Sequence, residues 1–236
     1  MLRFQTSARE GKARRSASAG SALSLPSVLL TGFDAFGGAS INPSWLAAAA
    51  LQGRRIAGHQ VVAAQLPTVF GQSLRELSGL LQLHRPALVI CLGQAGGRGA
   101  ISLERVAINI DDARIADNAA QQPIDSAVVP GAPAAYFTSL PIKAMLLSLH
   151  KAEVAAEVSQ SAGTFVCNHV FYGLMHELAT RRSLRNTRGG FVHVPFLPEQ
   201  GTPSMPLAEM VRALRILIRC ALRTERDVPL AAGANH

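Results

Sequence analysis

Short apolar runs alternate along the chain with segments in which apolar residues recur every three or four positions. The short runs are typical of strands buried on both faces of a sheet, and the periodic segments are typical of helices with one apolar face. Strands are expected at 28–31, 60–66, 87–92, 102–110, 154–160 and 190–194, and helices from residue 42, over about 69–83, over 142–149 and over about 206–222. This alternation predicts an α/β fold, a single-domain α/β/α sandwich with a largely parallel core sheet.

Three loops of unusual composition follow expected strands. Residues 32–38 and 93–99 are rich in glycine, and a loop bounded by prolines follows the strand that contains His193. Sites in parallel α/β sheets form at the carboxyl ends of the strands, so these loops are expected to surround the site. Residues 111–141 have few periodic signals and are expected to form a long ordered or lid-like loop.

The two ends of the chain differ from its middle. Residues 1–26 are rich in Ser, Ala and Arg, and they are expected to form a disordered basic extension. Their composition fits a transit-like leader, a misassigned start and a functional tail equally. A single globular domain is expected over residues 27–225, followed by a frayed tail over 226–236.

The net charge of +8 is concentrated in part at the N-terminus, where residues 1–26 carry five basic residues against one acidic residue. No stripe of Lys and Arg interleaved with aromatic residues occurs in the rest of the chain, so nucleic-acid binding is not expected. No apolar run reaches the roughly 18 residues that a membrane span needs. The odd number of widely spaced cysteines, Cys91, Cys167 and Cys220, favours a reducing compartment such as the cytoplasm and no disulfide framework.

Cys167 lies where an interrupted segment is expected to become a helix. Gly163 and Thr164 end the preceding element, and apolar residues return at helical spacing from Asn168 onward. Asn168 is expected to cap this helix, which would place Cys167 at the helix mouth. That position lowers the pKa of a thiol and supplies N–H donors for an oxyanion. The same local pattern also fits a small buried apolar residue, so the segment alone leaves both interpretations open.

Two other chemistries lack their motifs. The loop 32–38 does not have the G-x-G-x-x-G spacing, the second expected strand contains no acidic residue to hold a ribose, and no phosphate-loop motif occurs. His176-Glu177 lacks the second histidine of a zinc-peptidase motif, and His169 and His176 are about 10.5 Å apart along a helix. Nucleotide and metal binding are therefore not expected.

A thiol nucleophile needs a base and a group that orients the base. His193 is the one histidine inside an apolar strand, Phe-Val-His-Val-Pro, and a buried histidine needs polar partners. Glu104 is an acid within another apolar strand. Each residue also has a purely structural interpretation, a backbone-bonded histidine for His193 and a surface salt bridge for Glu104.

Five segments together resemble one known family. They are TGFDAFGG (31–38), GQAGGR (93–98), ERVAIN (104–109), GTFVCNH (163–169) and HVPFLPEQ (193–200). Their content and order are similar to pyroglutamyl peptidase I, also called pyrrolidone-carboxylate peptidase, over about residues 27–222. One departure is Ala35, where family members often have proline, which should alter loop stiffness more than chemistry.

The resemblance implies a cysteine exopeptidase that hydrolyses the bond after an N-terminal pyroglutamyl residue through a thioester acyl-enzyme. By matching motif, Cys167 is the nucleophile, His193 is the base and later the acid, and Glu104 orients His193. The resemblance implies no metal or organic cofactor. It also implies peptides with N-terminal pyroglutamate as partners, and a homo-oligomer, expected to be a tetramer.

The same resemblance assigns a pocket for the lactam ring. Phe33 and Phe36 are implied to contact its two faces, and Gln94 is placed near the oxyanion. The remaining residues that the resemblance implies are Phe165 and Val166 in the pocket wall and Arg114 near the site. Two rival functions stay open beside this one: another α/β cysteine hydrolase acting on a small amide, and an α/β binding protein whose basic tail contacts nucleic acid.

Overall fold

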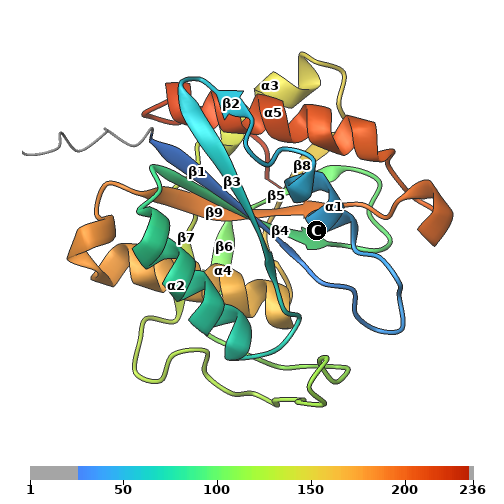
Figure 1. Ribbon diagram of the computed structural model, residues 1–236, viewed down its shortest axis with the longest axis vertical. Coiled ribbons are helices and arrows are strands. Elements are labelled where there is room, and N and C mark those ends of the chain that lie inside the picture. The colour runs from blue at the N-terminus through green and yellow to red at the C-terminus, as the bar shows by residue number, and fades with distance from the viewer. Residues whose placement is uncertain (1–25, 234–236) are drawn as a thin grey trace, which may run out of the picture.

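The computed structural model describes residues 26–233, so the expected basic extension lies, apart from Pro26, outside the described residues. A seven-stranded sheet of order β2-β3-β1-β4-β9-β5-β8 crosses this part of the chain (Figure 1). Its strands are β1 (Ser27–Phe33), β2 (Arg55–Ile56), β3 (His59–Leu66), β4 (Leu88–Gln94), β5 (Ile101–Glu104), β8 (Ala156–Ser159) and β9 (Arg188–Val194). Strands β3, β1, β4 and β9 are parallel, while β2 and β5 run antiparallel to their neighbours β3 and β9.

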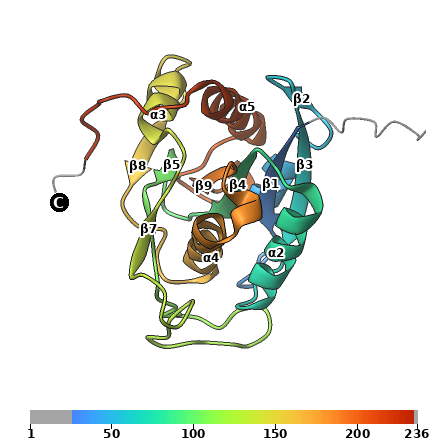
Figure 2. The ribbon, with the colours of Figure 1, turned by 90° about the vertical axis from the view of Figure 1, so that its left-hand side faces the viewer.

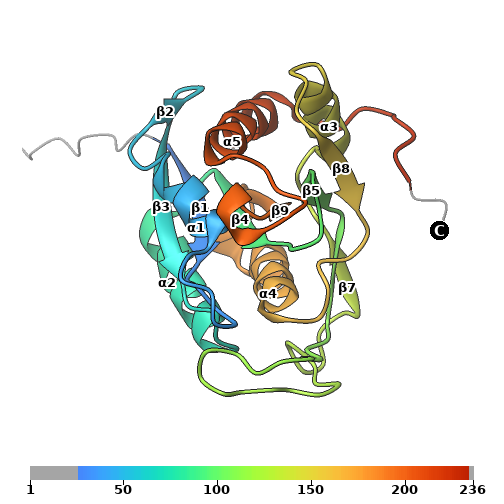
Figure 3. The ribbon, with the colours of Figure 1, turned by 90° about the vertical axis from the view of Figure 1, so that its right-hand side faces the viewer.

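Helices cover both faces of this sheet. The first hydrophobic core joins one face to α1 (Pro43–Ala49), α3 (Ile142–His150) and α5 (Leu207–Arg223). The second joins the opposite face to α2 (Gln72–His84) and α4 (Val166–Thr180). Figures 2 and 3 show α3 and α5 on one side of the strands and α2 and α4 on the other. The predicted α/β/α sandwich with a largely parallel sheet is confirmed.

Alternation along the strands decides which side chains face α4. Successive side chains of a strand point to opposite faces of its sheet. On β4, Ile90 and Leu92 belong to the core under α5, whereas Cys91 belongs to the core under α4. On β9, Val192 faces α5 and Phe191 faces α4. Gly93 and His193 come two positions after Cys91 and Phe191, so they also face α4. They lie near the carboxyl ends of β4 and β9.

The segment 102–110 does not form the single strand that was predicted. It divides at Arg105 into β5 and β6 (Val106–Ile108), and β6 pairs with β7 (Ala135–Phe137) in a separate two-stranded sheet. The Arg105 N–H donates to the Ser159 carbonyl, so pairing with β8 extends to this point and ends there. Alternation of apolar residues continues through the division, which explains why the sequence pattern suggests one strand.

The capping of α1 follows the sequence. Asn42 is the N-cap and accepts a hydrogen bond from the Ser44 N–H at 3.1 Å, with proline as the first helical residue.

The segment after residue 226 has no regular secondary structure as far as residue 233. It is nevertheless anchored, because the Asp227 carboxylate accepts hydrogen bonds from two N–H groups at the start of α3, at 3.0 and 2.9 Å. Within residues 26–233, no helix has both the length and the apolar character to cross a membrane.

Candidate active site

Helix α4 begins just before Cys167. Its N-cap is Phe165, so Cys167 is the second helical residue, and the expectation that Asn168 caps the helix is wrong. The Asn168 side chain is fully buried and bonds to β6 instead, accepting from the Ile108 N–H at 3.1 Å and donating to the carbonyls of Ile108 and Ile110 at 2.9 Å. These bonds fix the first turn of α4, whose leading backbone N–H groups have no acceptor within the helix.

The sulfur of Cys167 lies directly over Gly93 of β4. A Cβ atom at position 93 would be 2.7 Å from Cys167 Sγ and 2.8 Å from Cζ of Phe191, so only glycine leaves room for the thiol. Gly93 is paired in register with His193 on the neighbouring strand β9. Two positions after Cys91 and Phe191, both residues are on the sheet face that α4 covers. The fold therefore brings thiol and imidazole to adjacent positions at one end of the sheet.

His193 and Glu104 form a buried pair. Glu104 is fully buried, and its Oε1 accepts from His193 Nδ1 at 2.7 Å and from the Arg98 guanidinium at 3.0 Å. Because Nδ1 donates to the carboxylate, Nε2 is the nitrogen that is available to take a proton. Strand register brings His193 to Glu104, since Ser102 of β5 pairs antiparallel with His193, and Arg98 comes from the loop between β4 and β5.

Arg98 is a site residue that sequence reasoning did not single out. Its side chain is one-third exposed while the carboxylate that it contacts is fully buried. A buried carboxylate needs a charge partner, and Arg98 supplies it. The signal was present in the sequence, because Arg98 ends the glycine-rich segment 93–98 and Glu104 follows six residues later.

Burial controls the acidity of the thiol. The pKa of Cys167 is raised to about 12, chiefly because burial desolvates the thiol; the negative charge of Glu104 adds to the rise and the positive charge of Arg98 opposes it. The helix start was expected to lower this pKa, and desolvation outweighs that effect. The resting thiol is therefore protonated at neutral pH, and a thiol with this pKa can act as a nucleophile only where a base removes its proton.

Aromatic rings gather around Phe165, two residues before Cys167. The Phe165 ring lies 6.0 Å from the Phe36 ring, centroid to centroid, and 5.4 Å from Phe70 in an edge-to-face contact. Phe70 also meets the His169 ring edge-to-face at 5.3 Å. Phe36 and Phe165 are half-buried and keep part of their surface exposed. Such a wall suits a small, flat and largely apolar group.

His169 supports this wall from below. Its Nε2 accepts a hydrogen bond from the Gly71 N–H at 2.9 Å, so its Nδ1 carries the proton and donates to Asp111 Oδ2 at 2.8 Å. Both side chains of the pair are almost entirely buried. His169 therefore ties the first turns of α4 to Asp111 through Nδ1 and to the loop that carries Phe70 through Nε2, which is a structural role.

The other residues expected at the site have different surroundings. Gln94 accepts a hydrogen bond from Gln200 at 3.1 Å, which leaves its own amide N–H groups as donors. Phe33 and Val166 are 2% and 0% exposed, so they lie beneath the surface rather than on it. Arg114 is exposed and has no hydrogen bond or ion pair with any residue in 26–233.

The three loops expected at strand ends line one cleft of about 760 Å³. Its lining comes from the loop 36–41, from Gln94 and Gly96 after the core of β4, from Ile115, and from Phe196, Glu199 and Gln200 after β9. Gln94 and Phe196 of this lining come one and three positions after Gly93 and His193, so the cleft borders the ends of β4 and β9. A thiol, an imidazole bonded to a buried carboxylate and helix-end N–H groups near one cleft are the parts that nucleophilic acyl transfer needs.

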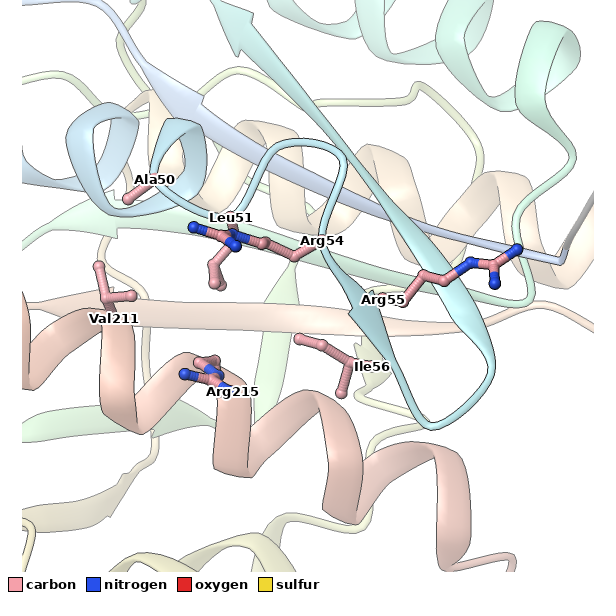
Figure 4. A pocket seen from close by; sticks show the side chains of 7 residues that line it. All are labelled: Ala50, Leu51, Arg54, Arg55, Ile56, Val211 and Arg215. Atoms are coloured by element: carbon pink, nitrogen blue, oxygen red, sulfur yellow. The ribbon is translucent and has the colours of Figure 1, made fainter.

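A second hollow, of about 370 Å³, lies between the end of α1, the β2–β3 hairpin and α5 (Figure 4). Arg54, Arg55 and Arg215 all line it, and in Figure 4 the Arg55 side chain points away from the other two. None of the residues expected at the site is among its lining. In the part of the chain that the structure describes, no three His, Cys, Asp or Glu side chains are grouped so as to hold a metal ion.

The family model described as pyroglutamyl peptidase matches residues 26–224. This chain belongs to the pyroglutamyl peptidase family. The resemblance inferred from the five segments is confirmed, and the match spans the whole sandwich with its thiol, imidazole and carboxylate.

Individual members of the pyroglutamyl peptidase family support the assignment. The pyrrolidone-carboxylate peptidase 1 of Ralstonia nicotianae is 55% identical over 217 residues, which are 90% of this chain and 100% of that protein. The crystal structure of pyroglutamyl peptidase I from Bacillus amyloliquefaciens is 45% identical, with a TM-score of 0.85, covering 88% of this chain and 100% of that one. A mutant pyrrolidone carboxyl peptidase from Pyrococcus furiosus is 41% identical with a TM-score of 0.80, covering 83% and 98%.

Proposed function

We propose that this chain is a cysteine exopeptidase that removes an N-terminal pyroglutamyl residue from peptides. The observation that carries the proposal is the position of Cys167 Sγ over Gly93, beside the buried His193–Glu104 pair, in a chain of the pyroglutamyl peptidase family. This arrangement also argues against the binding-protein alternative, because a buried base and acid beside a thiol serve no need of a binding surface.

The proposed reaction begins with proton transfer. Cys167 Sγ has no hydrogen bond within residues 26–233, and its pKa is raised by burial, so the thiolate forms only as attack begins. His193 Nε2 takes the thiol proton while Nδ1 remains bonded to Glu104, which stabilises the imidazolium that results. The sulfur attacks the carbonyl carbon that joins pyroglutamate to the next residue.

Acylation and deacylation then use the same groups. Backbone N–H groups in the first turn of α4 and the amide of Gln94 are proposed to hold the oxyanion, at about 3–4 kcal/mol for each donor in comparable sites. His193 gives its proton to the leaving amine, the C–N bond breaks, and the pyroglutamyl group remains on Cys167 as a thioester. Water, deprotonated by His193, hydrolyses the thioester and regenerates the thiol. None of these steps uses a metal or an organic cofactor.

The lactam ring is proposed to lie between the rings of Phe36 and Phe165. Phe33 and Val166 would shape the pocket from beneath, since both are buried under its surface. The exposed side chain of Arg114 is proposed to act near the cleft mouth, because its neighbour Ile115 lines the cleft. A pocket of this kind recognises a flat five-membered ring by its faces and the lactam by hydrogen bonds.

Selectivity for the lactam over proline tests the proposal. Proline has the same ring size but neither the ring carbonyl nor the amide N–H, so it leaves the polar groups of the site unpaired, and rejection by about 10⁴-fold is expected. The measurement compares kcat/KM for pyroglutamyl and prolyl aminocoumarin amides. Comparable values for the two amides would refute the proposed pocket, and hydrolysis of unrelated small amides would favour the alternative amidase.

Two further properties belong to the proposal. A reducing compartment, the cytoplasm, is proposed because Cys91, Cys167 and Cys220 are all free thiols. A homo-oligomer, and specifically a tetramer, is proposed from the family resemblance, and sedimentation of the purified protein tests it.

A further inference from the structure

We infer that the outer part of the cleft is a subsite for the peptide that follows the scissile bond, with a preference for an apolar residue directly after pyroglutamate and a basic residue after that. The inference rests on the proposed function. It assigns a role to the segment 196–200 and to residues 40 and 41, which the chemistry described above does not use.

The direction of the leaving group follows from the acid that protonates it. The amine nitrogen must lie next to His193 Nε2 when the C–N bond breaks. Strand β9 continues past His193 into the segment 196–200, which forms one wall of the cleft. The aromatic wall proposed to hold the lactam meets this cleft at Phe36, which lines it, whereas Phe165 at the start of α4 is outside the lining. The peptide beyond the scissile bond therefore enters the cleft.

The inner walls of the cleft are apolar and already in place. Phe196 and Ile41 contribute apolar side chains from two separate loops. The Phe196 ring fills the space over Gly96, where a Cβ would be 2.8 Å from ring atom Cε2, so the ring is fixed in position. Gln200 joins the walls, because its amide donates to Gln94 at 3.1 Å and to the Ile41 carbonyl at 3.4 Å. A pre-formed apolar slot favours a branched or aromatic side chain over alanine.

The outer end of the cleft is acidic. Glu199 is the one charged residue in the lining, and it is exposed. It makes no ion pair with another residue in 26–233. An unpaired carboxylate at the rim attracts a lysine or arginine side chain and repels an acidic one, and because the site is solvated the effect on rate is modest.

The experiment uses peptide amides of the form pyroglutamyl-X-Y and measures kcat/KM by release of the new amino terminus. With Y fixed, leucine at X should exceed alanine by about tenfold, which is typical of a few methylene groups in an apolar pocket. With leucine at X, lysine at Y should exceed glutamate by about threefold or more at low salt, and the ratio should fall as salt is added.

Glu199→Gln should bring the lysine-to-glutamate ratio close to one. Glu225→Gln is the matched control, since Glu225 is an exposed acid beyond the end of α5, and it should keep the wild-type ratio. Ser40→Trp, which places a large side chain in the cleft, should reduce the advantage of leucine over alanine.

The possible outcomes distinguish failure of the subsite from failure of the proposed function. If pyroglutamyl peptides are hydrolysed but kcat/KM does not depend on X or Y, the subsite is refuted and the proposed function stands. If neither the peptides nor the aminocoumarin amide is hydrolysed, the proposed function fails and the subsite fails with it. A lysine preference that survives Glu199→Gln refutes the acidic rim in particular.

Discussion

Gly93→Ala is the substitution that most sharply probes how the thiol is held. The added Cβ would lie 2.7 Å from Cys167 Sγ and 2.8 Å from Cζ of Phe191. Nonbonded heavy atoms prefer separations of about 3.5–4.0 Å, so relief of the clash requires a displacement of roughly 0.8–1.3 Å. Gly93 is on a central strand, and Phe191 is fully buried, so the sulfur is the atom that is freest to move.

A displacement of about 1 Å in a reacting atom typically costs about 10²-fold in rate. We therefore expect Gly93→Ala to lower kcat/KM for a pyroglutamyl amide by about two orders of magnitude. Overpacking of a buried site should also destabilise the fold by about 1–3 kcal/mol. Steady-state kinetics and urea denaturation measure the two effects separately.

Gly190→Ala is the matched control. A Cβ at Gly190 on β9 would overlap Thr138 Oγ1 and lie 2.7 Å from Leu140 Cδ1, which belongs to the core on the opposite face of the sheet. It should reduce stability by a similar amount and leave kcat/KM within a few-fold of wild type. If Gly93→Ala loses stability like the control but keeps wild-type kcat/KM, then the sulfur is not positioned by Gly93 and the reasoning is wrong.

Two further predictions concern charge and acidity. Arg98→Gln removes the charge partner of Glu104 and the positive charge that opposes the rise in the pKa of Cys167, so kcat/KM should fall by at least about tenfold. Arg98→Lys should recover part of the lost kcat/KM. If both variants have the same kcat/KM as wild type, Arg98 is dispensable. Burial also raises the pKa of Cys91 to about 12, whereas an unfolded thiol titrates near 8.5. From about pH 8.5 to 12 the unfolded chain releases a proton that the folded chain retains, so Cys91 should lower stability by about 1.4 kcal/mol per pH unit. The free energy of unfolding should therefore depend on pH with slopes that differ by that amount between wild type and Cys91→Ala across this range. Identical slopes would contradict a raised pKa of Cys91.

The sandwich could be predicted because its causes are local. Apolar strands and periodic helices follow from side-chain spacing, and Asn42 followed by proline marks the start of α1 in the sequence itself. The polar residues His193 and Glu104 were informative for the same reason, since each interrupts an apolar strand where a polar group needs a partner.

Features that depend on distant partners could not be predicted. Asn168 looks like a cap because asparagine is one of the preferred N-cap residues, and only the position of β6 shows that it bonds there instead. The need for glycine at position 93 arises from a sulfur 74 positions away in the chain, which no local pattern records. The direction of the pKa shift of Cys167 likewise depends on how deeply the folded chain buries it.

The central claim is that Cys167 forms the acyl-enzyme. The most direct test is to quench the protein with acid during turnover of a pyroglutamyl amide and to analyse its peptides by mass spectrometry. The account predicts a pyroglutamyl group on the peptide that contains Cys167, and loss of both the adduct and turnover in Cys167→Ala. Turnover that persists in Cys167→Ala, or an adduct on Cys91 or Cys220, would contradict it.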